Sequence, residues 1–574
     1  MQKVLTSLLI CFFYLSNLNA QHKTTWLGAG KIVDPYQYAQ VKHEFYNNAA
    51  VSCAHPLASL IGAQIMKQGG NAFDAGIAVQ LALSVVYPAA GNIGGGGFLI
   101  ARKPNKEIIA IDYREVAPSN ANKDMYLDKD GNAQLDLSQS GRLASGVPGT
   151  IAGIFATLPS AKLDFKLLIQ PAIDLAKYGY VITEREANGL NANKNAFLKH
   201  NSHTPALVKL TTPWKAGDTL IQQELAETLI RIRDHGAKGF YEGETARLIV
   251  AEMKQGNGII SLEDLKNYQA KIRVPLSFNY GGFEIYGFPP PSSGGILLLQ
   301  MMKMVEQTPY IKKGFQSPEA TQIMIEAERR AYADRAEHLG DPDFWKVPLK
   351  QLSEPNYIAN RMSDFTPGIA SKSVDIKGGM IKESEQTTHI SIYDKEGSMV
   401  SITTTLNGGY GSKTVVNGAG FLLNNEMDDF SVKPGVANMF GAVGGDANAI
   451  VPGKRMLSSM CPVIVTKNDQ PAIVVGTPGG TTIPTSVFQS LMNVIEFGMN
   501  TDEAVNVPKF HHQHLPDEVY IEPKFPENLR NALITMGYKL TNRASIGKTE
   551  MILIKNNKIE VAADRRGDDS VAGF

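Results

Sequence analysis

Groups that could bind a small zwitterion occur in four short stretches of the sequence. They are Arg114 in "IDYREVAP", Glu426 and Asp429 in "LLNNEMDDFS", Ser458 and Ser459 in "KRMLSSMCP", and Gly479 and Gly480 in "GTPGG". A guanidinium attracts a carboxylate, acids attract an ammonium, and exposed backbone N–H groups stabilise an oxyanion. Taken singly, each stretch is more often a surface salt bridge, an acidic turn or an ordinary loop. Taken together, they suit an amino-acid-like substrate.

A candidate nucleophile stands in the middle of the chain, in "ESEQTTHISIYD". Thr387 and Thr388 directly precede a β-rich run, and a hydroxyl becomes a good nucleophile only when a base takes its proton. Threonine is also common in strands because it is β-branched. By itself, the pair therefore predicts the start of a strand and no chemistry.

Three other patterns resemble cofactor or metal sites but each lacks a required part. "GYGSKT" lacks the Gly-Lys-Ser/Thr order of a phosphate loop, and "NIGGGG" precedes a strand where a dinucleotide site needs a helix. "FHHQHLPDE" gathers His511, His512 and His514 near two acids. Neighbouring histidines point in different directions, so this run is a weak metal candidate. We expect no metal and no organic cofactor.

The elements that must position these residues are both helices and strands. "NAFDAGIAVQLALSVVYP" is apolar nearly all round, which predicts a buried helix opened by Asp74 and stopped by Pro88. Residues 318–340 and 222–236 predict two amphipathic helices, the first ended by Gly340. Two β-rich runs after Thr387, and two more over residues 462–480, each predict a hairpin. The sequence therefore predicts sheets covered by helices.

Composition places the chain among ordinary globular proteins. The 574 residues include 56 Lys+Arg and 56 Asp+Glu, and 43% are hydrophobic. A zero net charge argues against a nucleic-acid or membrane-surface protein, because both usually carry a basic excess. After the first 20 residues only Cys53 and Cys461 remain. The sequence cannot place these two cysteines near each other, and buried free thiols are the favoured interpretation.

The first residues, "MQKVLTSLLICFFYLSNLNA", have the layout of a signal peptide with cleavage after Ala20. The apolar run over residues 4–15 is shorter than the roughly 20 residues that a membrane-spanning helix needs. A lipoprotein signal at Cys11 is disfavoured because bulky Ile10 precedes it. We therefore expect a periplasmic or secreted protein without stable membrane insertion.

Many separate strings resemble the γ-glutamyltransferases, in the right order and over nearly the whole chain after residue 20. They include "GGNAFDAGIAVQLALSVVYPAAGNIGGGGF", "IDYREVAP", "PPPSSGG", "QTTHISIYDKEGSMVSITTTLN", "NNEMDDFSVKPGV" and "GTPGG". The resemblance implies an N-terminal-nucleophile hydrolase of the α+β class with a four-layer αββα sandwich. It implies a precursor that cuts itself between Gln386 and Thr387. The products would be a large subunit, residues 21–386, and a small subunit, residues 387–574, which stay together as one intertwined domain.

The resemblance also implies a role for each candidate residue. Thr387 is the nucleophile that becomes γ-glutamylated, Thr405 hydrogen-bonds to it, and Gly479 and Gly480 supply the oxyanion hole. The remaining expected roles concern the substrate head group: Arg114, Ser458 and Ser459 hold the α-carboxylate, and Asn407, Glu426 and Asp429 hold the α-ammonium. The expected substrates are glutathione and related γ-glutamyl compounds, with water, an amino acid or a peptide as acceptor.

A lid loop is implied over residues 434–445, where Phe440 replaces the tyrosine of many bacterial relatives and cannot donate a hydroxyl hydrogen bond to Asn407. Two alternatives keep the fold but change the function. An acylase for glutaryl or cephalosporin side chains has no α-ammonium to bind, so Glu426 and Asp429 favour a glutamyl substrate. An exported binding protein needs neither Thr387 nor the two glycines.

Overall fold

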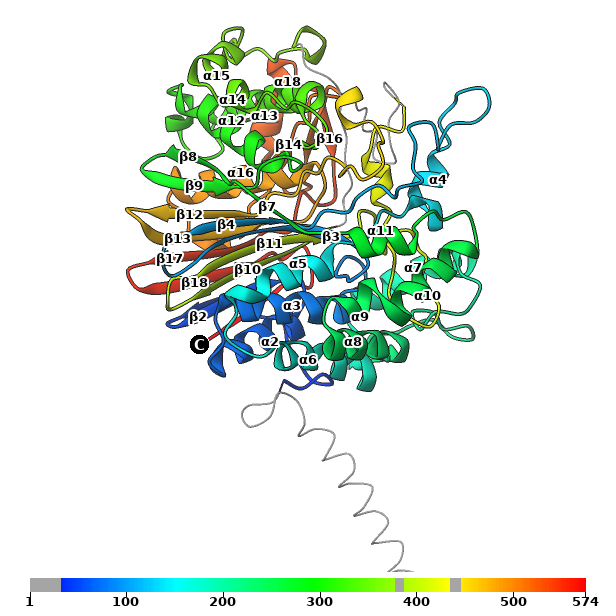
Figure 1. Cartoon of the computed structure of the whole chain (residues 1–574). Coiled ribbons are helices and arrows are strands. Elements are labelled where there is room, and N and C mark those ends of the chain that lie inside the picture. Colours follow the sequence, from blue (N-terminus) through cyan, green and yellow to red (C-terminus); the bar gives the residue numbers. More distant parts are fainter. Residues whose placement is uncertain (1–32, 377–386, 434–444) are drawn as a thin grey trace, which may run out of the picture.

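The computed structural model describes residues 33–376, 387–433 and 445–574. The expected signal peptide, Gln386 and Phe440 lie outside the described residues. Two antiparallel seven-stranded sheets lie face to face, and helices cover the outer side of each sheet (Figure 1). The four-layer αββα sandwich that the family resemblance implies is confirmed.

The spatial order of the strands differs from their order along the chain in both sheets. Across the first sheet the strands are β1 (His43–Tyr46), β18 (Lys558–Ala563), β17 (Glu550–Lys555), β13 (Gln470–Gly476), β12 (Val463–Lys467), β9 (Phe283–Gly287) and β8 (Leu276–Tyr280). Across the second sheet they are β19 (Ser570–Gly573), β2 (Ala49–Cys53), β10 (Thr387–Asp394), β11 (Met399–Thr405), β3 (Gly96–Arg102), β4 (Ile108–Asp112) and β7 (Lys271–Arg273). Small sheets are formed by β14 (Phe510–His511), β15 (Val519–Ile521) and β16 (Leu540–Asn542), and by β5 (Tyr180–Val181) and β6 (Thr219–Leu220).

The helices form two outer layers (Figure 1). The layer on the second sheet contains α2 (Pro56–Lys67), α3 (Ala72–Val86), α5 (Thr150–Thr157), α6 (Phe165–Tyr178) and α8 (Gln223–His235). The layer on the first sheet contains α12 (Gly294–Glu306), α13 (Pro318–His338), α16 (Thr482–Ile495) and α17 (Thr501–Asn506). The other helices are α4 (Leu135–Gln139), α7 (Glu184–His200), α9 (Lys238–Tyr241), α10 (Gly243–Lys254), α11 (Leu262–Asn267), α14 (Leu349–Leu352), α15 (Pro355–Arg361) and α18 (Glu527–Met536).

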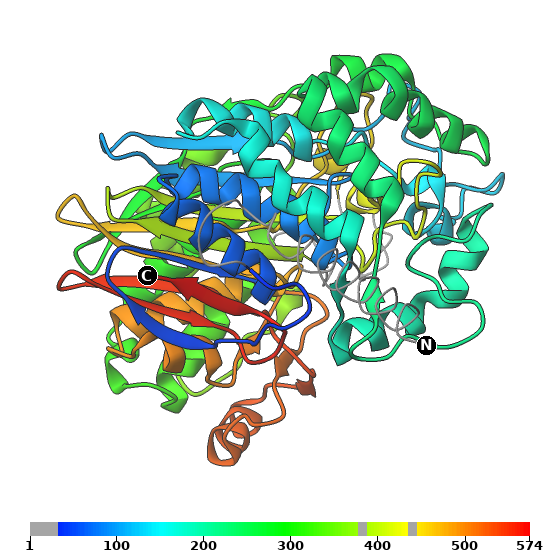
Figure 2. The same cartoon turned by 90° about the horizontal axis from the view of Figure 1, so that it is seen from below.

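Both sheets take strands from either side of Thr387. In the second sheet, β10 lies between β2, from the first part of the chain, and β11, from the second part. The last strand, β19, also pairs with β2, and Figure 2 shows these red and blue segments side by side. Neither part of the chain can therefore complete a sheet without the other.

The predicted buried helix is confirmed as α3, and every one of its residues is buried. Asn71 caps its first turn and Asp74 completes a capping box by accepting from the Asn71 backbone N–H at 2.8 Å. The helix ends at Val86, two residues before Pro88. A Cβ atom on Gly76 would lie 3.2 Å from Ile402, so α3 packs closely on β11.

The predicted helix over residues 318–340 is confirmed as α13, but its polar face is buried as well. Arg330 forms an ion pair with Glu326 within the helix, and Arg329 forms one with Asp517. The amphipathic pattern does not predict this burial, because segments from elsewhere in the chain cover the outer face and supply the charge partners. The predicted helix over residues 222–236 and both hairpins, β10–β11 and β12–β13, are also confirmed.

Within the three described ranges, no helix is both long enough and apolar enough to cross a membrane.

Candidate active site

Thr387 is the first residue of β10 and lies at the end of the second sheet where the polar loops gather. It is only 6% exposed. Its partner in the β10–β11 register is Thr405, which in turn pairs with Gly96 on β3. The Thr405 hydroxyl accepts a hydrogen bond of 2.7 Å from the backbone N–H of Asn407. The structure thus brings Thr387, Thr405 and Asn407 together, while a side-chain bond between the two threonines stays a prediction.

Asn407 turns the chain away from the end of β11. It has a positive φ of 72°, and its Nδ2 donates to the backbone oxygen of Asn425 at 3.0 Å. Asparagine tolerates this left-handed conformation better than most residues. The turn joins the Thr405 end of β11 to the loop that carries the acidic residues.

The glycine run that leads into β3 lets this loop region pack closely. A Cβ atom on Gly95 would lie 2.1 Å from the Thr405 backbone oxygen, and one on Gly96 would lie 2.7 Å from Oε2 of Glu115. Asn92 was not singled out from the sequence. Its side chain donates to the Thr405 backbone oxygen at 2.9 Å and accepts from Gly95 N at 3.0 Å. Asn92 therefore holds the glycine run against the end of β11.

Arg114 lies just beyond β4 and contacts the two acids that the sequence assigned to the opposite pole of the substrate. Its guanidinium is 2.7 Å from Oε2 of Glu426 and 2.5 Å from Oδ2 of Asp429. The exposed fraction of Arg114 is 1%, and Glu426 is fully buried. Arg114, expected to bind the substrate carboxylate, and Glu426 and Asp429, expected to bind its ammonium, therefore form one ion cluster.

Glu115 is a third acid in this cluster, and the sequence did not single it out. Its Oε2 lies 3.6 Å from Arg114, and the side chain is fully buried. Burial raises the pKa of Glu115 to about 8, although the positive charge of Arg114 opposes the shift. Glu115 is therefore mostly protonated at neutral pH, and Glu426 and Asp429 are the acids that lie closest to Arg114. Its position directly after Arg114 was the only sequence signal for it.

A backbone segment before β12 holds the other side of the guanidinium. Arg114 donates to the backbone oxygens of Met456 and Leu457, each at 3.4 Å. Asn448, another residue missed from the sequence, accepts from Leu457 N at 3.0 Å and donates to the Asp429 backbone oxygen at 2.7 Å. Asn448 thereby joins the two loops that contact Arg114.

Ser458 and Ser459 follow Leu457 directly, so the structure brings the serine pair to the Arg114 cluster. Both are nearly fully buried. The Ser458 hydroxyl accepts from Met460 N at 3.2 Å, and the Ser459 hydroxyl lies 3.5 Å from that of Ser293. Ser293 itself accepts from Arg335 of α13 at 2.7 Å. A buried side of α13 thus supports the serine pair.

Gly479 and Gly480 form the turn between β13 and α16. Their φ angles of 136° and 60° are positive, and a Cβ atom on Gly479 would lie 2.4 Å from Oγ1 of Thr482. The same strand brings Gly476 against the ring of His389, since a Cβ there would lie 2.2 Å from it. His389 is two residues beyond Thr387, so this turn begins opposite the start of β10. A side chain at Gly479 would clash with Thr482, so only backbone atoms occupy the turn at that position.

His389 belongs to the support of β10. Its ring nitrogens lie 2.9 Å from Oγ1 of Thr403 and 3.1 Å from Oγ of Ser391. Burial lowers the pKa of His389 to about 3, so the imidazole is neutral at neutral pH. It links β10 and β11 by hydrogen bonds and fills the space between the two sheets.

The remaining candidates from the sequence lie elsewhere. Cys53 and Cys461 are both free and buried, as the sequence favoured, and burial raises the pKa of both thiols. His511 lies 2.9 Å from both Thr485 and Gln513, so it is held by neutral partners. In the part of the chain that the structure describes, no group of three acidic, histidine or cysteine side chains could hold a metal ion.

Comparison with known proteins extends over nearly the whole chain. The sequence profile described as "Gamma-glutamyltranspeptidase" matches residues 58–574. The "Glutathione hydrolase proenzyme" of Escherichia coli is 43% identical over 530 residues, covering 91% of each chain. The structure of a γ-glutamyltranspeptidase from Helicobacter pylori is 43% identical, with a TM-score of 0.55, and covers 56% of this chain and 93% of that chain. A cephalosporin acylase from Bacillus halodurans has a TM-score of 0.81 at 25% identity and covers 95% of this chain and 99% of that chain.

Proposed function

Because the chain belongs to the γ-glutamyltranspeptidase family, we propose that it is a self-processing enzyme that cleaves the γ-glutamyl amide of glutathione and related compounds. It transfers the γ-glutamyl group first to Thr387 and then to water, an amino acid or a peptide. The observation that carries the proposal is the contact of Arg114 with Glu426 and Asp429, at the same edge of the second sheet as the start of β10.

The Arg114 cluster supports an α-amino-acid head group as the ligand. The substrate α-carboxylate binds the Arg114 guanidinium and the hydroxyls of Ser458 and Ser459. The α-ammonium binds the carboxylates of Glu426 and Asp429, both of which face the positive charge of Arg114. A buried charge needs partners of opposite charge or good hydrogen bonds. A zwitterionic head group supplies both signs, so it can enter the cluster and leave each charge with a partner.

Self-cleavage prepares the nucleophile. The Thr387 hydroxyl attacks the carbonyl carbon of Gln386, the acyl group moves from nitrogen to oxygen, and water hydrolyses the resulting ester. The freed α-amino group of Thr387 has an ordinary pKa of about 7.7–8.0. Part of it is neutral at physiological pH, so it takes the proton of its own hydroxyl as general base.

Catalysis then proceeds in two steps. The Thr387 oxygen attacks the γ-carbonyl carbon of the donor, and the Gly479 and Gly480 N–H groups stabilise the negative oxygen of the tetrahedral intermediate. The C–N bond breaks, the leaving amine takes the proton from the Thr387 amino group, and a γ-glutamyl ester remains. Water or an acceptor amine attacks this ester by the reverse sequence. Thr405 and Asn407 position Thr387 throughout.

A denaturing gel tests the self-cleavage. The wild-type protein gives two bands, and N-terminal sequencing of the smaller band reads Thr-Thr-His. Thr387→Ala gives one intact band and no turnover of γ-glutamyl-p-nitroanilide. The matched control is Thr388→Val, which alters the adjacent buried threonine and keeps both bands. A single intact band from the wild-type protein contradicts the proposal.

The fold similarity to a cephalosporin acylase supports a second candidate, an acylase for side chains without an α-ammonium. Rates for γ-glutamyl-p-nitroanilide and its glutaryl analogue separate the two functions. A strong preference for the glutamyl donor supports the transferase, whereas equal rates favour the acylase and remove the role of Glu426 and Asp429.

The N-terminal sequence supports export to the periplasm or the medium, with removal of residues 1–20. Mass spectrometry of the larger fragment from the exported fraction should find a chain that begins at Gln21. A larger fragment that retains residues 1–20 contradicts the export signal.

A further inference from the structure

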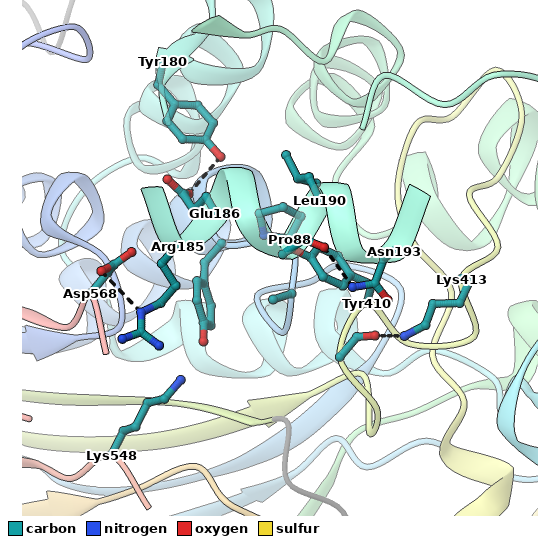
Figure 3. Close-up of a pocket in the computed structure, with 14 residues that line it drawn as sticks. Pro88, Tyr180, Arg185, Glu186, Leu190, Asn193, Tyr410, Lys413, Lys548 and Asp568 are labelled. Carbon is teal, nitrogen blue, oxygen red and sulfur yellow. Dashed lines mark hydrogen bonds and ion pairs between the residues drawn. The ribbon is translucent and has the colours of Figure 1, made fainter. Parts of the chain in front are cut away.

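A cavity of about 410 Å³ has no role in the mechanism above. Figure 3 shows it between helix α7 and the segment after α3, with the loop of Gly409 to Lys413 on one side and Lys548 on the other. Tyr87 and Tyr180 contribute aromatic surface to its wall. Its lining is therefore partly apolar and partly charged, as in sites for small polar ligands.

Two walls of the cavity continue directly into the candidate active site. Gly409 follows Asn407 by two residues. Lys548 follows Gly547, whose Cα lies 3.3 Å from the position that a Cβ on Gly479 would take. The backbone N–H of Lys548 also donates to Oγ1 of Thr477 at 2.7 Å, at the start of the same turn. The cavity therefore adjoins the loops around Thr387.

The strand order places the cavity and Arg114 on opposite sides of Thr387. Thr387 begins β10, whereas Arg114 follows β4, three strands along the second sheet in one direction. Asp568, in the cavity wall, precedes β19, two strands along in the other direction. A substrate whose glutamyl head lies at Arg114 and whose scissile bond lies at Thr387 therefore directs its remaining part toward the cavity.

The cavity wall contains three cations and two carboxylates, and the carboxylates already have partners. Glu186 accepts from Thr183 N at 2.7 Å and from the Tyr180 hydroxyl at 3.2 Å. Asp568 accepts from Oγ1 of Thr183 at 2.7 Å and from Gln40 at 3.0 Å. Three cations face two carboxylates in this wall, and the excess of positive charge favours a ligand carboxylate.

The three cations come from separate elements. Lys548 is half-buried and extends toward the cavity, and exposed Arg185 lies across from it, 3.6 Å from Asp568 (Figure 3). Lys413 donates to the Gly409 backbone oxygen, and burial lowers its pKa to about 8. Lys548 and Arg185 are therefore the cations best placed to meet a ligand carboxylate.

We propose that this cavity binds the carboxylate end of a short peptide, both in the leaving group of a γ-glutamyl peptide and in a peptide acceptor. Lys548 and Arg185 attract the carboxylate, and the tyrosines contact the adjoining residue. A dipeptide spans at most about 7 Å, and neighbouring strands lie about 4.8 Å apart. Such a tail extends from Thr387 past β2, in the direction of Asp568 and the cavity. This inference rests on the proposed function, and it predicts a preference for acceptors with a free C-terminal carboxylate.

Binding tests the inference without relying on turnover. Glycylglycine and glycylglycinamide differ only at the terminal carboxylate, and both are titrated calorimetrically into the full processed protein. We expect the wild type to bind glycylglycine about tenfold more tightly, and Lys548→Met to lose this preference. Arg185→Gln changes an exposed residue, so it tests the same point without risk to folding, and we expect it to reduce the preference about threefold. Equal affinities of the wild type for the two ligands overturn the proposal.

Kinetics test the same site with donors. Lys548→Met should raise the KM for glutathione about tenfold relative to that for γ-glutamyl-p-nitroanilide, whose leaving group has no carboxylate. Lys555→Met, at an exposed turn far along β17, is the matched control and should leave this ratio unchanged. An equal change in both KM values shows that Lys548 acts through the Gly479 turn and overturns the inference. A different outcome would contradict the proposed function alone. In that case the wild type does not turn over the anilide donor, yet it still binds glycylglycine more tightly than glycylglycinamide.

Discussion

Replacement of Arg114 by methionine tests the role of the ion cluster most directly. The change keeps much of the side-chain volume but removes the cation 2.7 Å from Glu426 and 2.5 Å from Asp429. Removal of one partner of a buried ion pair destabilises a protein by about 3–5 kcal/mol. We expect a clear fall in Tm, lessened at acidic pH because the two carboxyls can then bind protons.

The effect on activity should exceed what the loss of stability explains. Loss of a hydrogen bond to a charged ligand group weakens binding by about 1.5–3 kcal/mol, which is about 10- to 150-fold. Arg114→Met should therefore raise the KM for γ-glutamyl-p-nitroanilide by a factor in this range. The companion donor is 4-aminobutyryl-p-nitroanilide, which keeps the amine but lacks the α-carboxylate. The variant and the wild type should handle this donor with nearly equal kcat/KM.

Arg102→Met provides the matched control. Arg102 is a buried arginine at the far end of β3, where it donates to the backbone oxygens of Gly397 and Asp469 at 2.9 and 3.0 Å. This variant should lower Tm and leave the KM for the glutamyl donor unchanged. An equal loss of kcat/KM for both donors in Arg114→Met would refute the reasoning, because Arg114 would then act through the fold and not through the α-carboxylate.

Three further predictions concern the surroundings of Thr387. Gly479→Ala places a Cβ 2.4 Å from Oγ1 of Thr482, and loss of one oxyanion donor should reduce kcat about 10²- to 10³-fold in a steady-state assay with little change in KM. Asp429→Asn should raise the KM for the glutamyl donor about tenfold but not that for its glutaryl analogue, and equal changes would exclude ammonium binding. Burial lowers the pKa of His389 to about 3 and the unfolded value is about 6.5, so stability should fall by about 1.4 kcal/mol per pH unit as pH drops between these values. Denaturant titrations of His389→Gln should show an acid slope smaller by about one proton, and an unchanged slope would assign the proton elsewhere.

The sequence predicted the local elements because each carries its own signal. The hairpin after Thr387 alternates β-branched residues around a glycine turn, and the structure forms it with Thr387 opposite Thr405. The apolar run from Ala72 to Val86 is buried on all sides in α3. Such segments need no knowledge of distant partners, since hydrophobic pattern and turn chemistry decide them.

The burial of the charged face of helix α13 could not be predicted from its sequence pattern. Its charged residues predict a face toward water, yet Arg329, Arg330 and Arg335 are all nearly fully buried. Their partners include Asp517, far along the chain, and Ser293, in the segment before α12. Burial of a charged face depends on which segment covers it, and helical spacing contains no information about that segment.

The contacts between residues of the candidate site could likewise not be predicted from sequence spacing. The sequence and the family resemblance named Arg114, Glu426 and Asp429, but they assigned the arginine and the acids to opposite poles of the substrate. The structure joins them because β4 and the loop after β11 end at the same edge of the second sheet. Asn92 and Asn448 each donate to a backbone oxygen of another segment, Thr405 and Asp429 respectively, so no local spacing marked them. Glu115 was recognisable only once its burial beside Arg114 was known.

The strand order also explains how the proposed cut before Thr387 would leave the two parts of the chain together. The residues on both sides of the cut contribute strands to each sheet, and β10 stays between β2 and β11 whether or not its first residue is linked to the preceding one. The first pairing of β10 is that of Thr387 with Thr405, so the ladder itself fixes the position of the new terminus. A new N-terminus in an ordinary loop would be poorly ordered, because chain ends without hydrogen-bonded neighbours are mobile. As the first paired residue of a central strand, the proposed nucleophile Thr387 would hold its amine and its hydroxyl in one fixed geometry, which a general base and its nucleophile require.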